Sequence, residues 1–317
     1  MRKILITGGC GTVGSAFIDI FNNEYHFVSL SRNQEKQAAL KGKFSHVELC
    51  HGSIEDSDFL NNVFQNTKPD IVIHAAALKQ IDICEKNPSR AIESNILGSL
   101  NIIKMAKMHH VPITIGISSD KACESDSVYG HTKNLMERLF LEANDDHHRF
   151  MVCRFGNVAG SHGSVIPLWL AQAEKKMPLK ITDEKMNRFM FSQNDAALLI
   201  QQAISLAKEK KLGCILVKKL KPVNLCDLAK AIAVNGIEVI GKRPGERLNE
   251  TLVGKNELPY TFINGDMTMI RMEKNQDENT RLSEPFNTSS IMKMSANEIK
   301  NLISESVSFQ SRMECMV

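Results

Sequence analysis

The sequence has no long apolar run, no dense basic run and no cysteine pattern typical of a metal site. No segment approaches the roughly 18 consecutive apolar residues that cross a membrane, and the apolar start at residues 4–6 reaches glycines too soon for a signal peptide. The eight cysteines include no Cys-x-x-Cys pair, and most lie in apolar surroundings that suit reduced thiols. At a net charge of +3 the lysines and arginines are scattered. We therefore expect a reduced, cytoplasmic protein without a metal, a nucleic-acid partner or a membrane partner.

The alternation of strand-like and helix-like segments predicts the fold class. The 317 residues are 43% hydrophobic and 24% charged, which is ordinary for a globular chain. In the first half, short apolar runs alternate with helical patterns, as in a parallel sheet with crossover helices. The sequence therefore predicts an α/β protein with a Rossmann-type doubly wound parallel sheet. The expected strands lie at residues 3–7, 26–31, within 39–49, 70–76, 113–118 and 149–155, and the expected helices at 13–22, 89–108 and 128–144.

A glycine-rich turn directly follows the first expected strand. Gly8 permits a tight turn, Gly11 lets the backbone approach a pyrophosphate, and Gly14 lets the next helix pack close to the sheet. The N-terminus of that helix supplies free N–H groups and the positive end of a dipole. A glycine turn without a ligand is the alternative, but the strand–turn–helix context favours a dinucleotide site.

The end of the second expected strand indicates NADP rather than NAD. A carboxylate there would bind the ribose 2′-hydroxyl of NAD and repel a 2′-phosphate. The sequence instead has Ser31 and Arg32, followed by Lys36. A guanidinium fork and a second cation are therefore available for the phosphate, although a surface arginine is the alternative interpretation.

Tyr129 and Lys133 are four residues apart on an expected helix, so both lie on one face. An ammonium at that distance favours the phenolate, which predicts a lowered pKa for Tyr129 and a base that takes a proton from a hydroxyl while hydride leaves its carbon. The spacing is common by chance. Here, however, a cofactor loop precedes it and Ser118 and Ser119 end the strand before it, so we expect a redox site.

With these motifs the sequence resembles the extended short-chain dehydrogenases/reductases, and among them the UDP-N-acetylglucosamine 4,6-dehydratases that invert carbon 5. The resemblance covers residues 1–303. It rests on segments 7–14, 31–32, 74–80, 95–98, 118–122, 129–133 and 154–158, and it extends through 163–167, 181–183, 186–189 and 243–246.

The resemblance implies a catalytic role for the segment that follows the fifth strand. After oxidation at carbon 4, Lys121 would take the proton from carbon 5, and Asp120 would protonate the hydroxyl that leaves carbon 6. Ser119 would hold the developing oxyanion beside Tyr129. Lys121 can act only as a neutral amine, which partial burial and nearby Lys133 would favour. An exposed ion pair is the alternative interpretation of Asp120 and Lys121.

The expected NADP contacts come from the glycine turn, the ends of the next strands, one residue of the long helix and the Tyr–Lys pair. The segment after the third strand is where such folds pass the adenine, and small residues after the fourth strand let the backbone run beside a cofactor. The expected residues are Thr7, Gly8, Gly11, Thr12, Val13, Gly14, Ser31, Arg32, Lys36, Ser53, Ile54, Ala75, Ala76, Ala77, Asn95, Tyr129 and Lys133.

For a UDP-sugar substrate, the resemblance implies further contacts. Lys79 would face the sugar, Arg188 the diphosphate and Glu246 the uridine ribose, because a cation suits a diphosphate and a carboxylate suits a diol. Ordinary capping and surface roles are the alternative. The other expected substrate residues are Asn157, Ser164, Val165 and Thr182.

The loop before Tyr129 departs from the family pattern. Ser119 stands where threonine is usual, a proline and an asparagine before the tyrosine are missing, and Glu124 and Asp126 are gained. Asn187 also replaces the usual threonine. These changes bear on the identity of the sugar more than on the type of reaction.

Three other functions would use the same fold. A nucleotide-sugar 4-epimerase shares Tyr129 and Lys133 but needs no acid and base for carbon 6, so Asp120 and Lys121 favour the dehydratase. A non-catalytic NADP-binding protein would not require Ser119 together with that pair. A reductase of a sugar ketone would consume its cofactor stoichiometrically.

Three domain segments are expected. Residues 1–156 form the NADP-binding Rossmann domain with the catalytic groups, and residues 157–305 mainly form a smaller C-terminal substrate lobe, with some segments returning to the core. Residues 306–317 lack periodicity and are expected to be a disordered tail. The resemblance further implies a homo-oligomer.

Overall fold

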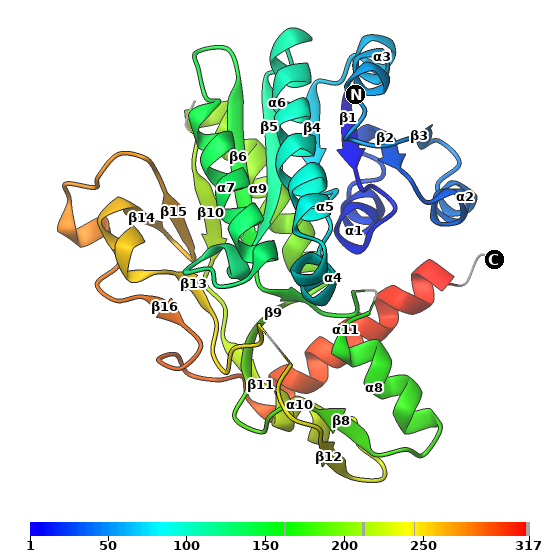
Figure 1. The fold of residues 1–317 in the computed structure, drawn as a ribbon, viewed down its shortest axis with the longest axis vertical. Helices are drawn as coiled ribbons and strands as arrows, with labels where there is room; N and C mark the ends of the chain where they lie inside the picture. Colours follow the sequence, from blue (N-terminus) through cyan, green and yellow to red (C-terminus); the bar gives the residue numbers. More distant parts are fainter. Residues whose placement is uncertain (162, 211–212, 244, 315–317) are drawn as a thin grey trace.

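A nine-stranded sheet in the order β14-β15-β10-β6-β5-β4-β1-β2-β3 is the framework of the computed structural model, which describes residues 1–161, 163–210, 213–243 and 245–314 (Figure 1). The strands from β10 to β3 run parallel, and β15 and β14 add antiparallel at one edge. The predicted Rossmann-type α/β fold is confirmed. The strands are β1 (Arg2–Thr7), β2 (Tyr25–Ser31), β3 (Glu48–His51), β4 (Ile71–His74), β5 (Ile113–Ser119), β6 (Arg149–Phe155), β10 (Ile215–Lys218), β14 (Thr261–Asn264) and β15 (Met267–Ile270).

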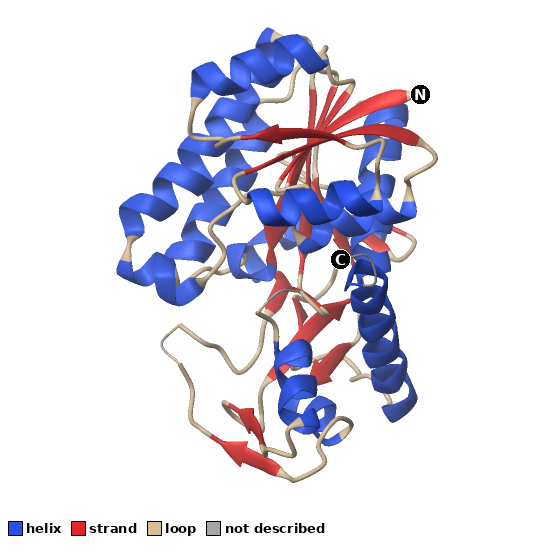
Figure 2. Ribbon diagram, turned by 90° about the vertical axis from the view of Figure 1, so that its right-hand side faces the viewer, coloured by secondary structure: helices blue, strands red, loops and turns tan. Residues whose placement is uncertain are grey.

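Helices cover both faces of this sheet (Figure 2). Alternate residues of β1 point to opposite faces, so Ile4 packs in one apolar cluster with Phe17 of α1, and Leu5 packs in another with Phe140 of α7. Each such side chain contributes about 1.5–3 kcal/mol by its burial. The helices of this part are α1 (Thr12–Ile20), α2 (Gln34–Lys43), α3 (Ser57–Thr67), α4 (Ile81–Lys86), α5 (Pro88–Ile92), α6 (Gly98–Met108), α7 (Val128–Glu142) and α9 (Gln193–Lys210).

The long helix expected at residues 89–108 is interrupted by a π-helical turn at Glu93–Leu97, between α5 and α6. Such turns insert one extra residue into a helix and are frequent at functional sites. Asn95 lies in this turn and is fully buried. The turn therefore places two polar side chains of the helix, Ser94 and Asn95, inside the protein.

The smaller lobe is built from short elements around a third apolar cluster. Trp169 is its largest buried side chain, and the indole N–H donates to the carbonyl of Lys180 at 2.9 Å. α9, β10, β14 and β15 come from the second half of the chain but belong to the large sheet and its cover. The lobe's elements are β7 (Asn157–Val158), α8 (Val165–Glu174), β8 (Leu179–Ile181), β9 (Asn187–Phe191), β11 (Pro222–Asn224), α10 (Leu225–Lys230) and β12 (Ile237–Val239). A two-stranded pair, β13 (Thr251–Val253) and β16 (Phe286–Asn287), packs against an apolar cluster of the large sheet instead.

The tail expected to be disordered is instead helical, so that prediction is wrong for residues 306–314. Helix α11 (Ala296–Glu314) contributes Ile299 and Leu302 to the small-lobe cluster, and it continues with buried Ser306 and Phe309. These four positions repeat at helical spacing, and their burial stabilises the helix. Residues 315–317 lie outside the described residues. None of the described helices combines the length and the apolarity that a membrane crossing needs.

Candidate active site

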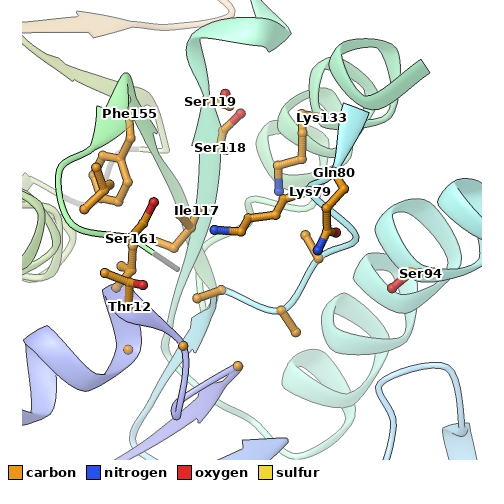
Figure 3. A pocket seen from close by; sticks show the side chains of 18 of the residues that line it. Thr12, Lys79, Gln80, Ser94, Ile117, Ser118, Ser119, Lys133, Phe155 and Ser161 are labelled. Carbon is orange, nitrogen blue, oxygen red and sulfur yellow. The ribbon is translucent and has the colours of Figure 1, made fainter. Parts of the chain in front are cut away.

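A cavity of about 530 Å³ opens at the carboxyl ends of the parallel strands, next to β1, where the order of the strands reverses (Figure 3). Ligands of open α/β sheets bind at this point. The cavity brings together most of the residues expected for the cofactor and all of those expected for catalysis. These lining residues are Gly8, Gly11, Thr12, Val13, Gly14, Ser31, Arg32, Lys36, Ile54, Ala75, Ala76, Ala77, Ser119, Asp120, Lys121, Tyr129 and Lys133.

The glycine turn leaves no room for side chains. Gly8 has a φ of +72°, and a Cβ there would lie 2.9 Å from the backbone nitrogen of Ala76. A Cβ on Gly14 would lie 2.6 Å from Cα of Gly9. The close contact of Gly14 is thus with the turn itself rather than with the sheet. Among the described residues, no side chain caps the N-terminus of α1, and a helix N-terminus favours the binding of a phosphate.

Arg32 and Lys36, in the segment after β2, and Lys79, after β4, are cations that line the cavity. Arg32 is half-exposed and lies 3.5 Å from the Glu55 carboxylate. Lys36 lies in the first turn of α2, and its backbone N–H donates to Asn33, the N-cap of that helix. Burial, and then the charge of Lys36, lower the pKa of Lys79. Figure 3 shows the side chains of Lys79 and Lys133 extending into the same space.

Ser119, Asp120 and Lys121 form a compact group at the end of β5, where Asp120–Ala122 form a short 3-10 helix. The Ser119 hydroxyl donates to Asp120 Oδ1 at 2.9 Å, and Lys121 Nζ donates to Asp120 Oδ2 at 3.2 Å. Asp120 is buried, and Lys121 is largely so. Gly130 of α7 permits this arrangement because a Cβ there would collide with the carbonyl oxygen of Lys121.

Tyr129 and Lys133 both lie on α7 and line the cavity, but their electrostatics differ from the prediction. Burial raises the pKa of Tyr129 well above its usual value, a hydrogen bond with Ser119 partly opposes the increase, and Asp120 adds to it. The predicted lowering is therefore wrong for the protein without its cofactor. Burial also lowers the pKa of Lys133 to about 8, against an opposing effect of Glu137. The desolvation of these groups outweighs their mutual influence.

Glu250 completes this group, although the sequence analysis did not single it out. Its carboxylate is fully buried and lies 2.7 Å from Lys121 Nζ and 3.7 Å from Nε of Arg188. Burial raises its pKa, and Lys121 opposes this. Glu250 lies 129 positions after Lys121 in the sequence, so no local pattern could have paired them.

The sequence matches a family model described as polysaccharide biosynthesis protein over residues 4–271. The chain belongs to this family. A relative from Campylobacter jejuni named UDP-N-acetylglucosamine 4,6-dehydratase (inverting) is 34% identical over 83% of this chain and 81% of its own. A relative from Rickettsia bellii named UDP-glucose 4-epimerase is 30% identical over 95% of both chains. The solved structure of Pen from Bacillus thuringiensis has a TM-score of 0.87 at 30% identity, covering 96% of this chain and 98% of Pen.

These relatives confirm the resemblance to the extended short-chain dehydrogenases/reductases. The chain is an enzyme of that class with a site for NAD or NADP.

Five residues expected to contact the substrate do not line the cavity. Arg188 is buried and donates to the carbonyl of Asn187 at 2.8 Å. The Thr182 hydroxyl donates to Met186 Sδ, and Glu246 accepts from the backbone of Arg243. Ser164 and Val165 begin α8 in the small lobe. Of the substrate residues, only Lys79 and Asn157 line the cavity, and the roles of all seven stay predictions.

Three expected cofactor residues support the cavity from behind. The Asn95 amide accepts from the N–H of Leu78 at 2.7 Å and donates to its carbonyl at 3.0 Å, which fixes the loop after β4. Thr7 is buried and accepts from the N–H of Ala76 at 3.3 Å. Ser53 accepts from the N–H of Glu55.

Sequence reasoning missed further lining residues. Most of them neighbour a predicted residue on the same loop or strand end, and Ser94 lies beside Asn95 in the π-helical turn. These residues are Cys10, Leu30, Asn33, Gly52, Gln80, Ile81, Ser94, Ile117, Ser118, Phe155, Gly156, Val158 and Ser161.

His74 ends β4 and is buried, and its burial predicts that the stability of the protein depends on pH. Its Nδ1 lies 2.8 Å from the Thr7 hydroxyl and its Nε2 3.0 Å from the Ser99 hydroxyl. Burial, and then the charge of Lys133, lower its pKa from 6.5 to about 3. A depressed pKa gives stability that is fully present above pH 6.5 and is lost as the pH falls to about 3. The expected loss is on the order of 5 kcal/mol, since one pKa unit corresponds to about 1.4 kcal/mol.

Urea unfolding at several pH values measures this loss. Between pH 3 and 6.5, the free energy of unfolding of the wild type should vary with pH by the amount that one proton contributes. In His74→Asn this contribution is expected to disappear. An identical slope in the wild type and the variant would contradict a buried neutral histidine.

Proposed function

We propose that the protein is an NADP-dependent lyase, a 4,6-dehydratase that converts UDP-N-acetylglucosamine to a UDP-4-keto-6-deoxy sugar with inversion at carbon 5. The observation that carries the proposal is the contact of Asp120 with Lys121, at 3.2 Å, in the cavity that Tyr129 and Lys133 share. An elimination of water needs an acid and a base beside a redox site, and a simple dehydrogenation or epimerisation does not. The Campylobacter jejuni relative supports the same reaction.

The residues of the cavity fit a dinucleotide. The uncapped α1 N-terminus suits the pyrophosphate, and Gly8 and Gly14 lie where any Cβ would clash with backbone. Arg32 and Lys36 would hold a 2′-phosphate, and Lys133 would hold the nicotinamide ribose. Bound NADP would supply the hydride acceptor for carbon 4 and return the hydride to carbon 6.

The chain's own groups would move the protons. With NADP bound, Tyr129 would act as the phenolate, which the nearby Lys133 ammonium would favour, and would take the proton of the carbon-4 hydroxyl. Ser119 would stabilise the oxygen that carries the developing charge. Lys121, as the amine, takes the proton from carbon 5, which the neighbouring ketone acidifies. Asp120 gives its proton to the carbon-6 hydroxyl, which leaves as water. The two ion-paired groups therefore serve as base and acid in one elimination.

Incubation with UDP-N-acetylglucosamine and a catalytic amount of NADP tests the proposal by mass spectrometry. We expect a product lighter by one water, formed without net consumption of the cofactor. A 4-epimerase is the second candidate, favoured by the Rickettsia bellii relative, and it would give a product of unchanged mass. A reductase would consume cofactor stoichiometrically, and the absence of any product would support a non-catalytic protein.

Arg32 is expected to select NADP over NAD. Its guanidinium can form charge-assisted hydrogen bonds with a phosphate, each worth about 1.5–3 kcal/mol. Arg32→Ala should therefore raise the Kd of NADP by about 10- to 100-fold and change the Kd of NAD little. Calorimetric titration measures both constants. Arg312→Ala, which removes an arginine paired with Asp19 outside the cavity, is the control, and equal losses for both cofactors would contradict the assignment.

The cytoplasmic location and the homo-oligomeric state expected from the sequence stay predictions.

A further inference from the structure

Glu250 has a carboxylate that the protein buries beside two cations. Its two carboxylate oxygens are inaccessible, and among the described residues no group donates to them at hydrogen-bond angles. Attraction to Lys121 and Arg188, at 2.7 and 3.7 Å, is what offsets the lost hydration. Burying a carboxylate beside two cations still costs free energy of folding. The presence of Glu250 beside Lys121 therefore favours a role in the site.

The backbone on both sides of Glu250 is fixed. The N–H of Glu250 donates to the Thr288 hydroxyl at 3.0 Å, and the N–H of Thr288 donates to the carbonyl of Glu250 at 2.9 Å. Two residues further on, the carbonyl of Leu252 accepts from the buried Arg154 guanidinium at 2.7 Å. The carboxylate therefore belongs to the residue that directly precedes β13, a strand anchored to β6 of the large sheet. Lys121, in contrast, has a flexible four-carbon stem.

We infer that Glu250 is a positioning residue, whose carboxylate holds Lys121 Nζ against Asp120 at the wall of the cavity. The inference rests on the proposed role of Lys121 as the base. Lys121 Nζ is 3.2 Å from Asp120 Oδ2, so one proton can move from the ammonium to the carboxylate and create the amine and the acid together. When Lys121 takes the carbon-5 proton and Asp120 gives its own to the leaving hydroxyl, both return to the charged pair. Glu250 holds the amine in place in both states, and Arg188 balances its charge.

Two variants separate the charge of Glu250 from its shape. Glu250→Gln keeps the size and removes the charge, and Glu250→Asp keeps the charge on a shorter side chain. Asp19→Asn is the matched control, because it removes a largely buried carboxylate that pairs with Lys43 at 2.9 Å outside the cavity. Two measurements are made on each protein. Acetylation of Lys121 by acetic anhydride, followed by peptide mass mapping, needs no substrate, and water loss from UDP-N-acetylglucosamine reports the reaction.

In Glu250→Gln, we expect acetylation of Lys121 at neutral pH to be at least about tenfold faster than in the wild type. The amide no longer favours the ammonium over the amine, while the nearby Arg188 disfavours it. We expect kcat for water loss to fall about 100-fold with KM unchanged, because the amine of Lys121 is no longer positioned to reach the carbon-5 proton. Reduction of bound NADP on adding substrate should persist, since Tyr129 and Lys133 are intact. Glu250→Asp should recover part of kcat, and Asp19→Asn should match the wild type.

Unchanged acetylation of Lys121 in Glu250→Gln would overturn the inference, and so would faster acetylation with unchanged water loss. A wild-type protein that releases no water is a different result and refutes the dehydratase proposal. If the wild type releases no water, faster acetylation in Glu250→Gln would still support the interaction of Glu250 with Lys121, because the labelling does not depend on turnover.

Discussion

Lys121→Ala is expected to abolish water loss and the exchange of the carbon-5 proton with solvent while leaving the Kd of NADP unchanged. General bases contribute about 10²–10⁴-fold to a rate, and Lys121 is the lysine that pairs with Asp120, at 3.2 Å. NADP binding should persist because the glycine turn and the expected phosphate contacts lie on other elements. Mass spectrometry in deuterated water measures water loss and exchange in one experiment.

Asp120→Asn separates the acid from the base. This variant should release water slowly, since an amide cannot protonate the leaving hydroxyl. Its carbon-5 proton should exchange more slowly than in the wild type, because Lys121 can then lose its proton to solvent but not to Asp120. Lys43→Ala, the lysine of the Asp19 pair outside the cavity, is the control. Water loss at the wild-type rate in Lys121→Ala would show that the base is another group.

Arg154→Met is expected to lower the free energy of unfolding by about 3–5 kcal/mol, the usual effect of breaking a buried ion pair from one side. Arg154 is fully buried, and its guanidinium lies 2.6 Å from Glu137 Oε2 and 2.8 Å from Glu257 Oε1. The substitution strands the Glu137 carboxylate, which is buried on α7. Urea unfolding followed by circular dichroism measures the loss.

Removing both charges distinguishes a stranded carboxylate from a lost packing contact. Arg154→Met combined with Glu137→Met should recover part of the stability, because a buried ion pair replaced by apolar groups of similar volume is often neutral. Arg281→Met, which removes an arginine paired with the exposed Glu278, should change stability by less than about 0.5 kcal/mol. A double variant no more stable than the single one would contradict this explanation.

The sequence predicted many of the residues that line the cavity beside β1 because the relevant signals are local. A strand, a glycine turn and a helix follow one another within residues 2–20, and Tyr129 and Lys133 need only one helical turn to share a face. The periodicity of the strands was sufficient to predict the doubly wound sheet. The chemistry at Asp120 and Lys121 came from family resemblance, and their contact in the structure agrees with it.

The rest of the site depends on contacts between distant segments. Glu250 lies beside Lys121 through contacts of the backbone around it with Arg154 and Thr288, and nothing near Glu250 in the sequence indicates this. The pKa of Tyr129 was predicted in the wrong direction because the helical spacing shows the neighbouring cation and not the desolvation. The helix at residues 306–314 was missed because its apolar positions are sparse and the surface that covers them comes from elsewhere in the fold.

The π-helical turn at Glu93–Leu97 means that the two parts of this helix face different partners. On the side of α5, Ala91 packs in a cluster with Tyr129, and on the side of α6, Ile102 and Met105 pack toward the sheet. A residue added to a helix rotates everything after it by about 100°. Deleting one residue here would therefore not merely shorten the segment. It would turn the sheet-facing side of α6 toward solvent, so the length of this stretch is under the same constraint as the register of a strand.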